Sequence, residues 1–310
     1  MLASVPPSPR SEDAATIAHI RAFMSGCSFE ATRPTAADAS VLRQFITPGD
    51  QVYISAVRGR PISESIDAAT VIRAVGLEPV PHVAARSFAS ARDCEIAIER
   101  FTGEADVRTI MLIGGDIDRP AGPLTSALDV IESGVLTKYG ITAVGLAGYP
   151  EPHPRIGPDE LEAALVTKSA AAQAQGLDVH IVTQFSFDHE PILRWIGWLR
   201  ARGVNLPVKV GLAGPASVAT WLNYGRRCGV RASASALASR TGLVRHLFKA
   251  VSPDPIIHEL AERSAAGKLN GVTAHMYSFG GAAQTARWLR AARDGEIFLE
   301  GERGFRVLAH

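Results

Sequence analysis

The chain has 310 residues, of which 46% are hydrophobic and 20% are charged. This is enough apolar material for one large core, and α/β barrels of this length commonly form a single unit. The 32 basic and 31 acidic residues give a formal net charge of +1, so the overall charge does not indicate nucleic acid or a membrane surface as a partner. A small anionic substrate remains compatible, because it needs only a local basic patch.

Neither the N-terminal segment nor the cysteine pattern indicates secretion. Residues 1–26 lack the continuous apolar stretch of a secretory signal, and no segment approaches the roughly 20 apolar residues of a membrane helix. Cys27, Cys94 and Cys228 are widely spaced, which fits a reducing compartment better than a disulfide framework. We therefore expect a cytoplasmic protein in which residues 1–12, rich in Pro and Ser, form a flexible N-terminal arm.

Short apolar runs alternate along the chain with longer segments of helical pattern. Eight runs have the length and composition of buried strands: Gly26–Glu30, Gln51–Ala56, Val80–Ala84, Thr109–Ile113, Ile141–Ala147, Val179–Gln184, Val208–Leu212 and Gly271–Tyr277. Six segments between them have the amphipathic pattern of helices: Ile62–Val75, Ser90–Phe101, Asp159–Gly176, His189–Arg202, Pro215–Gly229 and Ala282–Ala292.

This alternation of strand and helix, without a break in composition, predicts βα units that close a parallel sheet on itself. The predicted fold class is α/β, a (β/α)8 TIM-type barrel, with residues 13–310 as one catalytic domain. A doubly wound open sheet is the alternative, but it usually carries a glycine-rich phosphate loop after its first strand. Residues 29–34, FEATRP, are not such a loop. In a barrel, the chemistry lies at the carboxyl ends of the strands.

Three polar residues lie at or just after the ends of predicted strands. Glu30 ends the first strand, where desolvation is expected to raise its pKa and suit it to acid catalysis, although a pair with Arg33 would make it structural. Asp116 follows a Gly-Gly pair ending at Gly115, which lets the backbone approach a ligand closely, or else it caps a tight turn. His82 belongs to the third strand and, taken alone, is more typical of a structural histidine.

Two loops near the predicted mouth carry polar and aromatic residues. Three prolines in five residues stiffen the loop after the fifth strand, which presents Tyr149, Glu151 and His153 in defined directions. Gln184 ends the sixth strand and offers both a donor and an acceptor to a heterocyclic amide edge. The histidines are scattered without metal-site spacing, so no metal is predicted. A Ser–His–Asp hydrolase is not indicated, because GxSxG is missing.

These residues belong to short motifs that follow one another in a defined order. The motifs are Ser28-Phe29-Glu30, Pro81-His82, Gly115-Asp116, Ala147-Gly148-Tyr149-Pro150-Glu151-Pro152-His153-Pro154, Thr183-Gln184-Phe185-Ser186-Phe187-Asp188 and His275-Met276-Tyr277. The motifs and their order resemble those of the methylenetetrahydrofolate reductases. The resemblance extends from about residue 26 to residue 290. The YPExHP and TQFxFD patterns are specific in combination, whereas SFE or GGD alone carries no weight.

The resemblance implies an FAD-containing (β/α)8 barrel that uses NAD(P)H to reduce 5,10-methylenetetrahydrofolate to 5-methyltetrahydrofolate. It therefore implies FAD as cofactor, NADH or NADPH as co-substrate and a folate as substrate, with the reaction running in either direction. In such an enzyme the cofactor supplies the electrons, while the protein supplies orientation and a proton. The sequence leaves a homo-oligomer open, and it gives no sign of a nucleic acid or membrane partner.

The resemblance also assigns roles to single residues. Glu30 matches the general acid of the family, and Asp116 matches a carboxylate near flavin and pterin. Gln184 matches a glutamine that binds folate, and Tyr224 falls where the family has an aromatic ring that stacks on nicotinamide or folate. The positions that match FAD contacts are His82, Gly115, Asp116, Tyr149, His153 and Lys168.

The chain departs from the family at several contact positions. Gly114 replaces an arginine, Ala56 replaces a threonine that contacts flavin, and Gly281 replaces an arginine used for folate. Nearby arginines offer replacement charge, namely Arg58, Arg60 or Arg86. These differences leave a second hypothesis, a flavin-free folate-binding barrel that is either a direct-hydride reductase or a tetrahydrofolate-dependent methyltransferase. A third hypothesis, a non-catalytic folate-binding regulator, agrees less well with the retained carboxylates.

Overall fold

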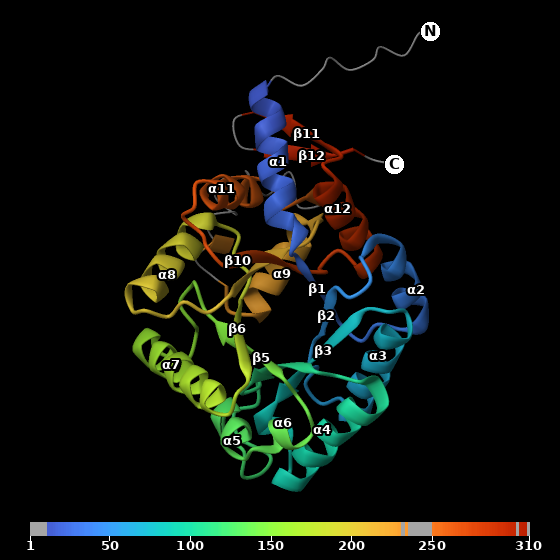
Figure 1. Cartoon of the computed structure of the whole chain (residues 1–310), viewed down its shortest axis with the longest axis vertical. Helices are drawn as coiled ribbons and strands as arrows, with labels where there is room; N and C mark the ends of the chain where they lie inside the picture. The colour runs from blue at the N-terminus through green and yellow to red at the C-terminus, as the bar shows by residue number, and fades with distance from the viewer. Residues whose placement is uncertain (1–10, 231–232, 235–249, 302–303, 309–310) are drawn as a thin grey trace.

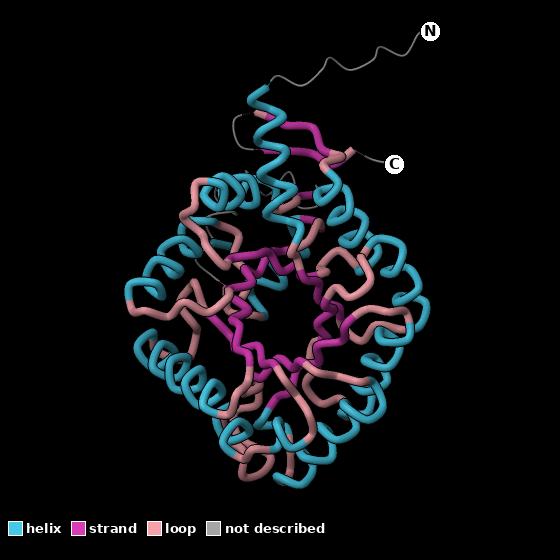
Figure 2. Tube along the Cα trace, in the orientation of Figure 1, coloured by secondary structure: helices cyan, strands magenta, loops and turns pink. Residues whose placement is uncertain are grey.

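The computed structural model describes residues 11–230, 233–234, 250–301 and 304–308. Eight parallel strands form a closed barrel in the order β1-β10-β7-β6-β5-β4-β3-β2, which Figure 2 shows as a ring with helices around it. These strands are β1 (Ser28–Ala31), β2 (Gln51–Ile54), β3 (Glu78–Ala84), β4 (Thr109–Ile113), β5 (Ala143–Gly148), β6 (Asp178–Thr183), β7 (Val208–Ala213) and β10 (Val272–Tyr277). Each overlaps one predicted strand, so the predicted TIM-type barrel is confirmed.

Helices cover the outside of the barrel (Figure 1). The six predicted helices are present as α3 (Ile62–Ala74), α4 (Ala91–Ala105), α7 (Pro158–Ala174), α8 (His189–Ala201), α9 (Val218–Arg227) and α12 (Ala282–Asp294). Further helices, which the sequence pattern did not predict, are α1 (Ser11–Ser25), α2 (Ala36–Phe45), α5 (Ala127–Glu132), α6 (Val135–Lys138) and α11 (Asp254–Ala265), with the short 3₁₀ helix η1 (Ala85–Ser87).

The first helix lies outside the barrel, beside the last ones. α1 packs against α11 and α12 (Figure 1) and buries Ile20, Phe23 and Met24. Residues 11 and 12 of the predicted arm belong to this helix, and the rest of that arm lies outside the described residues. The assignment of residues 13–310 to one domain stays a prediction.

Two small antiparallel pairs accompany the barrel. β11 (Ile297–Glu300) pairs with β12 (Gly304–Val307) after α12. β8 (Ala216–Ser217) pairs with β9 (Ala250–Val251). Because β8 occupies the start of the predicted helix Pro215–Gly229, α9 begins later, at Val218.

Alternate residues of each strand face the helices and the barrel interior, as the pleat of a strand requires. In β10, Val272, Ala274 and Met276 belong to the large apolar core shared with the helices. The alternate residues His275 and Tyr277 face the barrel interior, where their rings meet edge to face. The interior of this barrel is therefore partly polar and aromatic, and it is here that side chains suited to chemistry gather.

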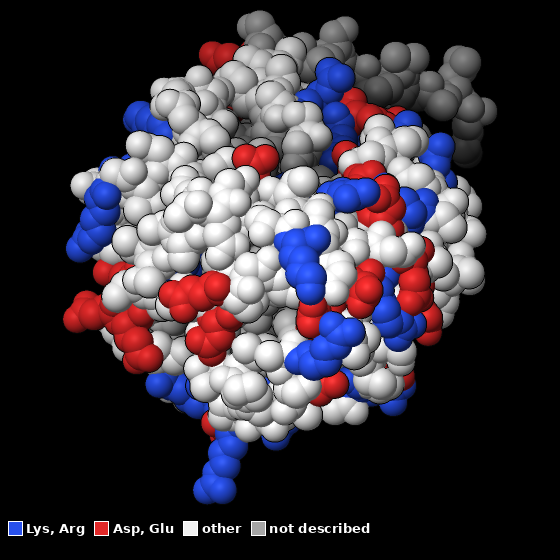
Figure 3. Space-filling model, turned by 60° about the horizontal axis from the view of Figure 1, so that its bottom comes forward, with Lys and Arg blue, Asp and Glu red and all other residues white. Residues whose placement is uncertain are grey.

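The face of the surface seen in Figure 3 carries side chains of both signs. Basic and acidic side chains interleave on its right side, and several acidic side chains lie together at its lower left. None of the described helices combines the length and apolar character needed to cross a membrane. Among the described residues, no group of three or more His, Cys, Asp or Glu is arranged to hold a metal ion.

Candidate active site

The barrel interior holds a carboxylate, Glu30, that is only 7% exposed. Ser55 Oγ donates a hydrogen bond to Glu30 Oε1 at 2.5 Å. His275 Nε2 lies 3.2 Å from Oε2, and His82 Nε2 lies 3.5 Å from the same oxygen. Ser28 Oγ is 2.8 Å from His275 Nδ1, so a His275 protonated on Nε2 donates to Glu30 and accepts from Ser28. We call Glu30, Ser55, His82 and His275 the acid cluster.

The acid cluster determines the charge of Glu30. Burial by itself favours the neutral carboxyl, which was the reason to expect a raised pKa. His82 and His275 together outweigh burial and hold the pKa of Glu30 well below its usual range. The expected rise is therefore wrong, because it considered desolvation without the two histidines. Glu30 is therefore ionised in the free protein.

His82 has a ring nitrogen that the described residues leave without a hydrogen bond. Its Nε2 is buried and has no hydrogen-bond partner among the described residues, since 3.5 Å to Glu30 is within ion-pair distance but beyond an ordinary hydrogen bond. A buried polar atom without a partner is unfavourable. A ligand atom or a small approach of Glu30 would satisfy it.

A second polar pair lies next to the acid cluster. Tyr53, which is fully buried, donates its hydroxyl to His180 Nε2 at 2.6 Å, and its ring packs edge-on against His275 at 4.7 Å. Burial lowers the pKa of His180 to about 3, and the charges of Lys209 and His275 add to the effect. His180 is therefore a neutral acceptor. Neither Tyr53 nor His180 was predicted as a site residue, although strand alternation places both inside the barrel.

We expect this buried histidine to make the fold less stable as the pH falls below about 6.5. The pKa of His180 is about 3 in the fold against 6.5 ordinarily, so between these values the unfolded chain binds a proton that the folded chain does not. The loss amounts to roughly 2 kcal/mol at pH 5. Glu30 affects the stability of the fold at lower pH than His180 does. Its pKa is lowered in the fold, so the free energy of unfolding falls only below the ordinary pKa of 4.5.

Urea unfolding between pH 5 and pH 8 measures this loss. His180→Gln keeps an acceptor for Tyr53 and should flatten the pH dependence. Stability that stays constant or increases below pH 6.5 in the unsubstituted protein would show that His180 is protonated in the fold.

Aromatic rings line the mouth beside the acid cluster. Tyr224 stacks on Phe279 with ring centroids 4.0 Å apart and an interplanar angle of 8°. Phe279 also contacts Phe185 at 4.8 Å and Tyr277 at 5.7 Å. Tyr277 is the register partner of Glu30 in the neighbouring strand, which links this aromatic wall to the carboxylate. Tyr224 is thus placed to present one ring face to a planar ligand.

The loops after β4 and β5 bring three predicted residues close together. The rings of Tyr149 and His153 meet edge to face at 5.2 Å. Burial raises the pKa of Tyr149 and the charge of Asp116 adds to this rise. Burial lowers the pKa of His153, against the opposing influence of Asp116. Gly115 has φ +99°, and a Cβ there would lie 3.2 Å from Ala84 Cβ, so a glycine lets this loop lie against the end of β3.

Glu151 has a structural position between the loops. It accepts hydrogen bonds at Oε1 from the hydroxyls of Ser186 at 2.6 Å and Ser233 at 2.5 Å. The backbone N–H of Ser233 donates to Oε2 at 3.1 Å. Gln184 precedes Ser186 by two residues, and its Oε1 accepts a hydrogen bond from the Phe185 N–H at 3.1 Å. Its amide NH2 has no hydrogen-bond partner among the described residues, so it is available to a ligand.

Lys168, a predicted FAD contact, lies on a helix. It is on the third turn of α7, and burial lowers the pKa of its ammonium group. The structure therefore gathers Glu30 with His82, and Asp116 with Tyr149 and His153.

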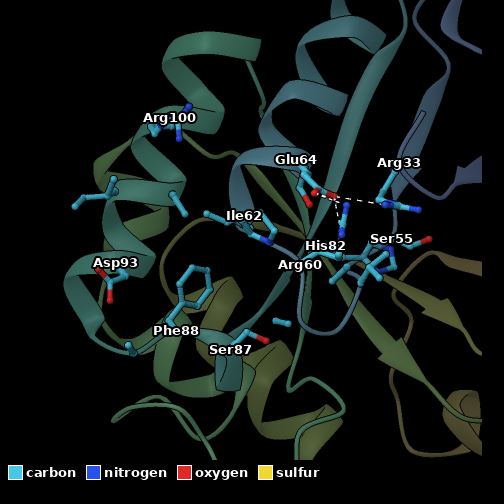
Figure 4. Close-up of a pocket in the computed structure, with 18 residues that line it drawn as sticks. Arg33, Ser55, Arg60, Ile62, Glu64, His82, Ser87, Phe88, Asp93 and Arg100 are labelled. Carbon is cyan, nitrogen blue, oxygen red and sulfur yellow. Dashed lines mark hydrogen bonds and ion pairs between the residues drawn. The ribbon is translucent and has the colours of Figure 1, made fainter. Parts of the chain in front are cut away.

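A cavity of about 440 Å³ opens from the acid cluster toward the outside of the barrel. Ser55 and His82 line its inner end, and residues of α3 and α4 form its walls (Figure 4). The cavity thus reaches two residues that contact or approach Glu30, namely Ser55 and His82.

Ser55→Ala is expected to raise the pKa of Glu30. A hydrogen bond to a charged group contributes about 1.5–3 kcal/mol, so the ionised carboxylate becomes less stable when the donor is removed. Infrared difference spectra of the carboxylate band, recorded against pH and corrected with Glu30→Gln, measure this rise. Ser87→Ala is the matched control, because Ser87 lines the same cavity without touching Glu30. An equal shift in both variants would rule out a specific role for Ser55.

The fold and these groups define a (β/α)8 barrel with an acid–base cluster and an aromatic wall at the carboxyl ends of its strands. The sequence profile described as methylenetetrahydrofolate reductase matches residues 54–235, more than half of the chain. The chain belongs to the methylenetetrahydrofolate reductase family, among barrel enzymes of folate metabolism.

Two comparisons with single proteins accompany this assignment. The chain is 30% identical over 113 residues to methylenetetrahydrofolate reductase 2 of Saccharomyces cerevisiae (strain ATCC 204508 / S288c), which covers 34% of this chain and 18% of the yeast protein. The match thus spans less than a fifth of that relative. Among solved structures, dihydropteroate synthase from Thermus thermophilus is 15% identical with a TM-score of 0.45, over 85% of this chain and 90% of that chain.

Proposed function

We propose that this protein transfers hydride between NAD(P)H and a folate, interconverting 5,10-methylenetetrahydrofolate and 5-methyltetrahydrofolate. The observation that carries the proposal is the acid cluster, a buried carboxylate with His82 Nε2 3.5 Å from Glu30 Oε2, in a barrel of this family. Reduction of the methylene bridge consumes one hydride and one proton, so the site needs a proton donor where the pterin binds.

The chain's own residues account for the proton. Protonation of folate N10 breaks its bond to the methylene carbon and leaves an iminium at N5, and hydride addition to that carbon gives the methyl group. A pterin that covers Glu30 removes its remaining solvent, which raises the proton affinity of the carboxylate. Glu30 then holds the proton for N10, with His82 as its neighbouring exchange partner. In the opposite direction, Glu30 accepts the same proton.

The aromatic wall and Gln184 would orient the substrates. Tyr224 offers a ring face to the nicotinamide or the pterin, because stacked planar rings attract one another. The free amide NH2 of Gln184 would donate to an acceptor on the pterin edge. Holding both reactants in one geometry is itself a large part of catalysis in hydride transfer.

FAD fits these residues in part. Tyr149 and His153 present rings that pack on flavin or adenine, and Lys168 carries a desolvated ammonium group that suits a phosphate. His82, Gly115 and Asp116 would hold the flavin end. When bound, FAD would relay hydride between nicotinamide and folate.

A flavin-free route to the same products is the second candidate. The observation that favours it is Gly114, where an added Cβ would meet nothing within 4 Å. Gly114 therefore lacks the arginine side chain that would help hold FAD, although there is room for one. Ala56 likewise lacks the hydroxyl of a threonine. In this case hydride passes from nicotinamide to folate directly. A folate-dependent methyltransferase would use the same pterin site without NAD(P)H.

We expect the protein to bind FAD more weakly than a protein that has an arginine in place of Gly114 and a threonine in place of Ala56. Each missing hydrogen bond to a charged group is worth roughly ten- to a hundredfold in affinity, so part of the purified protein should lack FAD. Titration of the apoprotein with FAD, followed by flavin absorbance, measures the affinity. Folate-dependent NAD(P)H oxidation without FAD binding would establish direct hydride transfer. A lack of NAD(P)H-dependent turnover with or without FAD would contradict the proposed reductase.

A further inference from the structure

We propose that Thr32 and Ser55 form a proton relay that connects solvent to Glu30 while a bound pterin covers the mouth of the barrel. The inference rests on the proposed function, in which Glu30 is ionised in the free protein and holds a proton only once the pterin covers it. The proton must therefore reach Glu30 after the pterin has displaced the water above it, which requires a second way in.

Two described side chains make hydrogen bonds to the carboxylate of Glu30, and they lead to different surroundings. Ser55 Oγ lies 2.5 Å from Oε1, and His275 Nε2 lies 3.2 Å from Oε2. Behind His275 is Ser28, which bonds to its Nδ1 and is only 2% exposed. Behind Ser55 is Thr32, whose Oγ1 lies 3.2 Å from Ser55 Oγ and which is exposed. Among the described residues, the branch through Ser55 is thus the one that reaches solvent.

The direction of each hydrogen bond in this branch follows from the charge of Glu30. An ionised carboxylate can only accept, so the single hydroxyl proton of Ser55 is directed at Glu30 Oε1. Ser55 therefore accepts from Thr32, which donates its own hydroxyl proton across 3.2 Å. Both hydroxyl protons point toward the carboxylate, and Thr32 Oγ1 can accept a hydrogen bond from water. The Thr32–Ser55 bond is long for two hydroxyls, so this link is the one to test.

The backbone holds the relay in place. Glu30 and Thr32 are two residues apart at the end of β1, so their side chains lie on the same side of the strand. The Ser55 N–H donates to the Ala31 carbonyl at 3.2 Å, which continues the β1–β2 pairing as far as Ser55. The chain bends directly afterwards, at Arg33, whose φ of +48° is uncommon for a residue with a side chain. Thr32 therefore occupies a defined position beside Ser55.

Proton transfer along this chain is balanced at every atom. An acid in solution, hydronium or a buffer acid, gives a proton to Thr32 Oγ1 as the Thr32 hydroxyl proton passes to Ser55 Oγ. The Ser55 proton passes in turn to Glu30 Oε1, so each hydroxyl regains the proton it loses and only the carboxylate changes charge. Rotation of the two hydroxyls then restores their starting directions. Thr32 and Ser55 act through Glu30 and need no contact with the substrate.

His82 is the competing point of entry for the proton. It lies with Ser55 at one end of the cavity (Figure 4), and its side chain is 13% exposed. Its Nε2 is 3.5 Å from Glu30 Oε2, beyond an ordinary hydrogen bond, whereas Ser55 is bonded at 2.5 Å. A flavin held by His82 would also cover this route. Thr32 lies outside the residues that line the cavity, so the route through Thr32 would stay in contact with solvent.

Proton uptake during pterin binding tests the relay. The probe is tetrahydrofolate, mixed rapidly with the protein in weakly buffered solution that contains a pH indicator, while protein fluorescence follows binding in a parallel mixture. We expect uptake by the unsubstituted protein to keep pace with binding, and we expect Glu30→Gln to abolish it. Subtracting the Glu30→Gln signal therefore isolates the proton that Glu30 takes up.

Thr32→Val, which removes the outer hydroxyl, should delay this uptake without reducing its final extent. No hydrogen bond joins Thr32 to Glu30 among the described residues, so the proton affinity of the carboxylate should not change. We expect a slowing on the order of 10²-fold, the lower end of what a positioned proton-transfer group contributes. Thr32→Ser keeps a hydroxyl and should restore most of the rate. Thr47→Val is the matched control, because Thr47 is exposed and precedes β2 at the opposite end of the barrel.

The outcomes separate the relay from the proposed function. Uptake that still keeps pace with binding in Thr32→Val/Ser55→Ala, which lacks both hydroxyls, overturns the relay alone. Uptake delayed by His82→Gln but not by Thr32→Val assigns the entry to His82 and also overturns it. If tetrahydrofolate binds without proton uptake while NAD(P)H-dependent turnover persists, the inference fails and the reductase stands. A protein that does not bind tetrahydrofolate overturns both.

Discussion

Replacing Glu30 by glutamine is expected to lower the rate of folate reduction by about 10²–10⁴-fold, the usual cost of losing one acid–base group. The amide can still accept the hydrogen bond from Ser55, so the shape of the site and the affinity for folate should change little. It cannot hold or release the proton that N10 requires. Single-turnover measurements with saturating folate isolate this step from binding.

A second reaction, which needs no proton at N10, shows whether Glu30→Gln impairs the protein in some other way. Reduction of an artificial electron acceptor by NAD(P)H requires no proton at N10, so Glu30→Gln should leave it largely unchanged. Glu99→Gln, at an exposed position on α4, controls for the loss of one carboxylate. If Glu30→Gln slows both reactions equally, or lowers folate affinity by the full factor, Glu30 is a structural residue and the proton must come from another group.

The barrel could be predicted from the sequence because its signals are local. Each strand is a short apolar run between turn residues, and runs such as Thr109–Ile113 coincide with the observed strand. Helices without a strong pattern were not found. α2 is only ten residues long and begins with a capping box of Thr35 and Asp38, a signal that was present but is easily missed in a short helix. α5 and α6 have six and four residues, too few for a helical period to be visible.

The candidate site could be predicted only in part, for a different reason. Glu30, His82 and Gln184 follow from the rule that strand ends carry the chemistry. The neighbours that determine the charge of Glu30 come from distant positions, because His275 lies 245 residues away in sequence. Barrel closure brings β10 against β1, and that contact leaves no mark in the local pattern. The direction of the Glu30 pKa therefore required the structure.

Glu151 shows how a residue of a recognisable motif can have a role other than the expected one. The proline-rich loop was expected to present it toward a ligand, but it is buried and bonded to serines on two other segments. Its position suggests that the motif preserves loop geometry as well as ligand contacts. Tyr149 and His153, on either side of it, would then depend on Glu151 for their placement at the mouth.

Glu151→Ala is therefore expected to destabilise the protein and to weaken binding at the mouth. The carboxylate accepts three hydrogen bonds, from Ser186 and Ser233, and hydrogen bonds to charged groups contribute about 1.5–3 kcal/mol each without being additive. We expect a loss of about 3 kcal/mol or more in unfolding free energy, since buried donors are left without partners. Glu151→Gln, which retains one acceptor oxygen, should lose less.

Thermal unfolding and FAD titration of the same variants separate the two effects. At about 2 °C per kcal/mol for a protein of this size, Glu151→Ala should lower the unfolding midpoint by roughly 6 °C. FAD affinity should fall too, because the loop that holds Tyr149 and His153 loses its anchor to Ser186 and Ser233. Glu160→Ala, at an exposed position on α7, should leave both quantities unchanged. A variant that unfolds at a lower temperature but binds FAD as before would show that Glu151 stabilises the fold without positioning the loop.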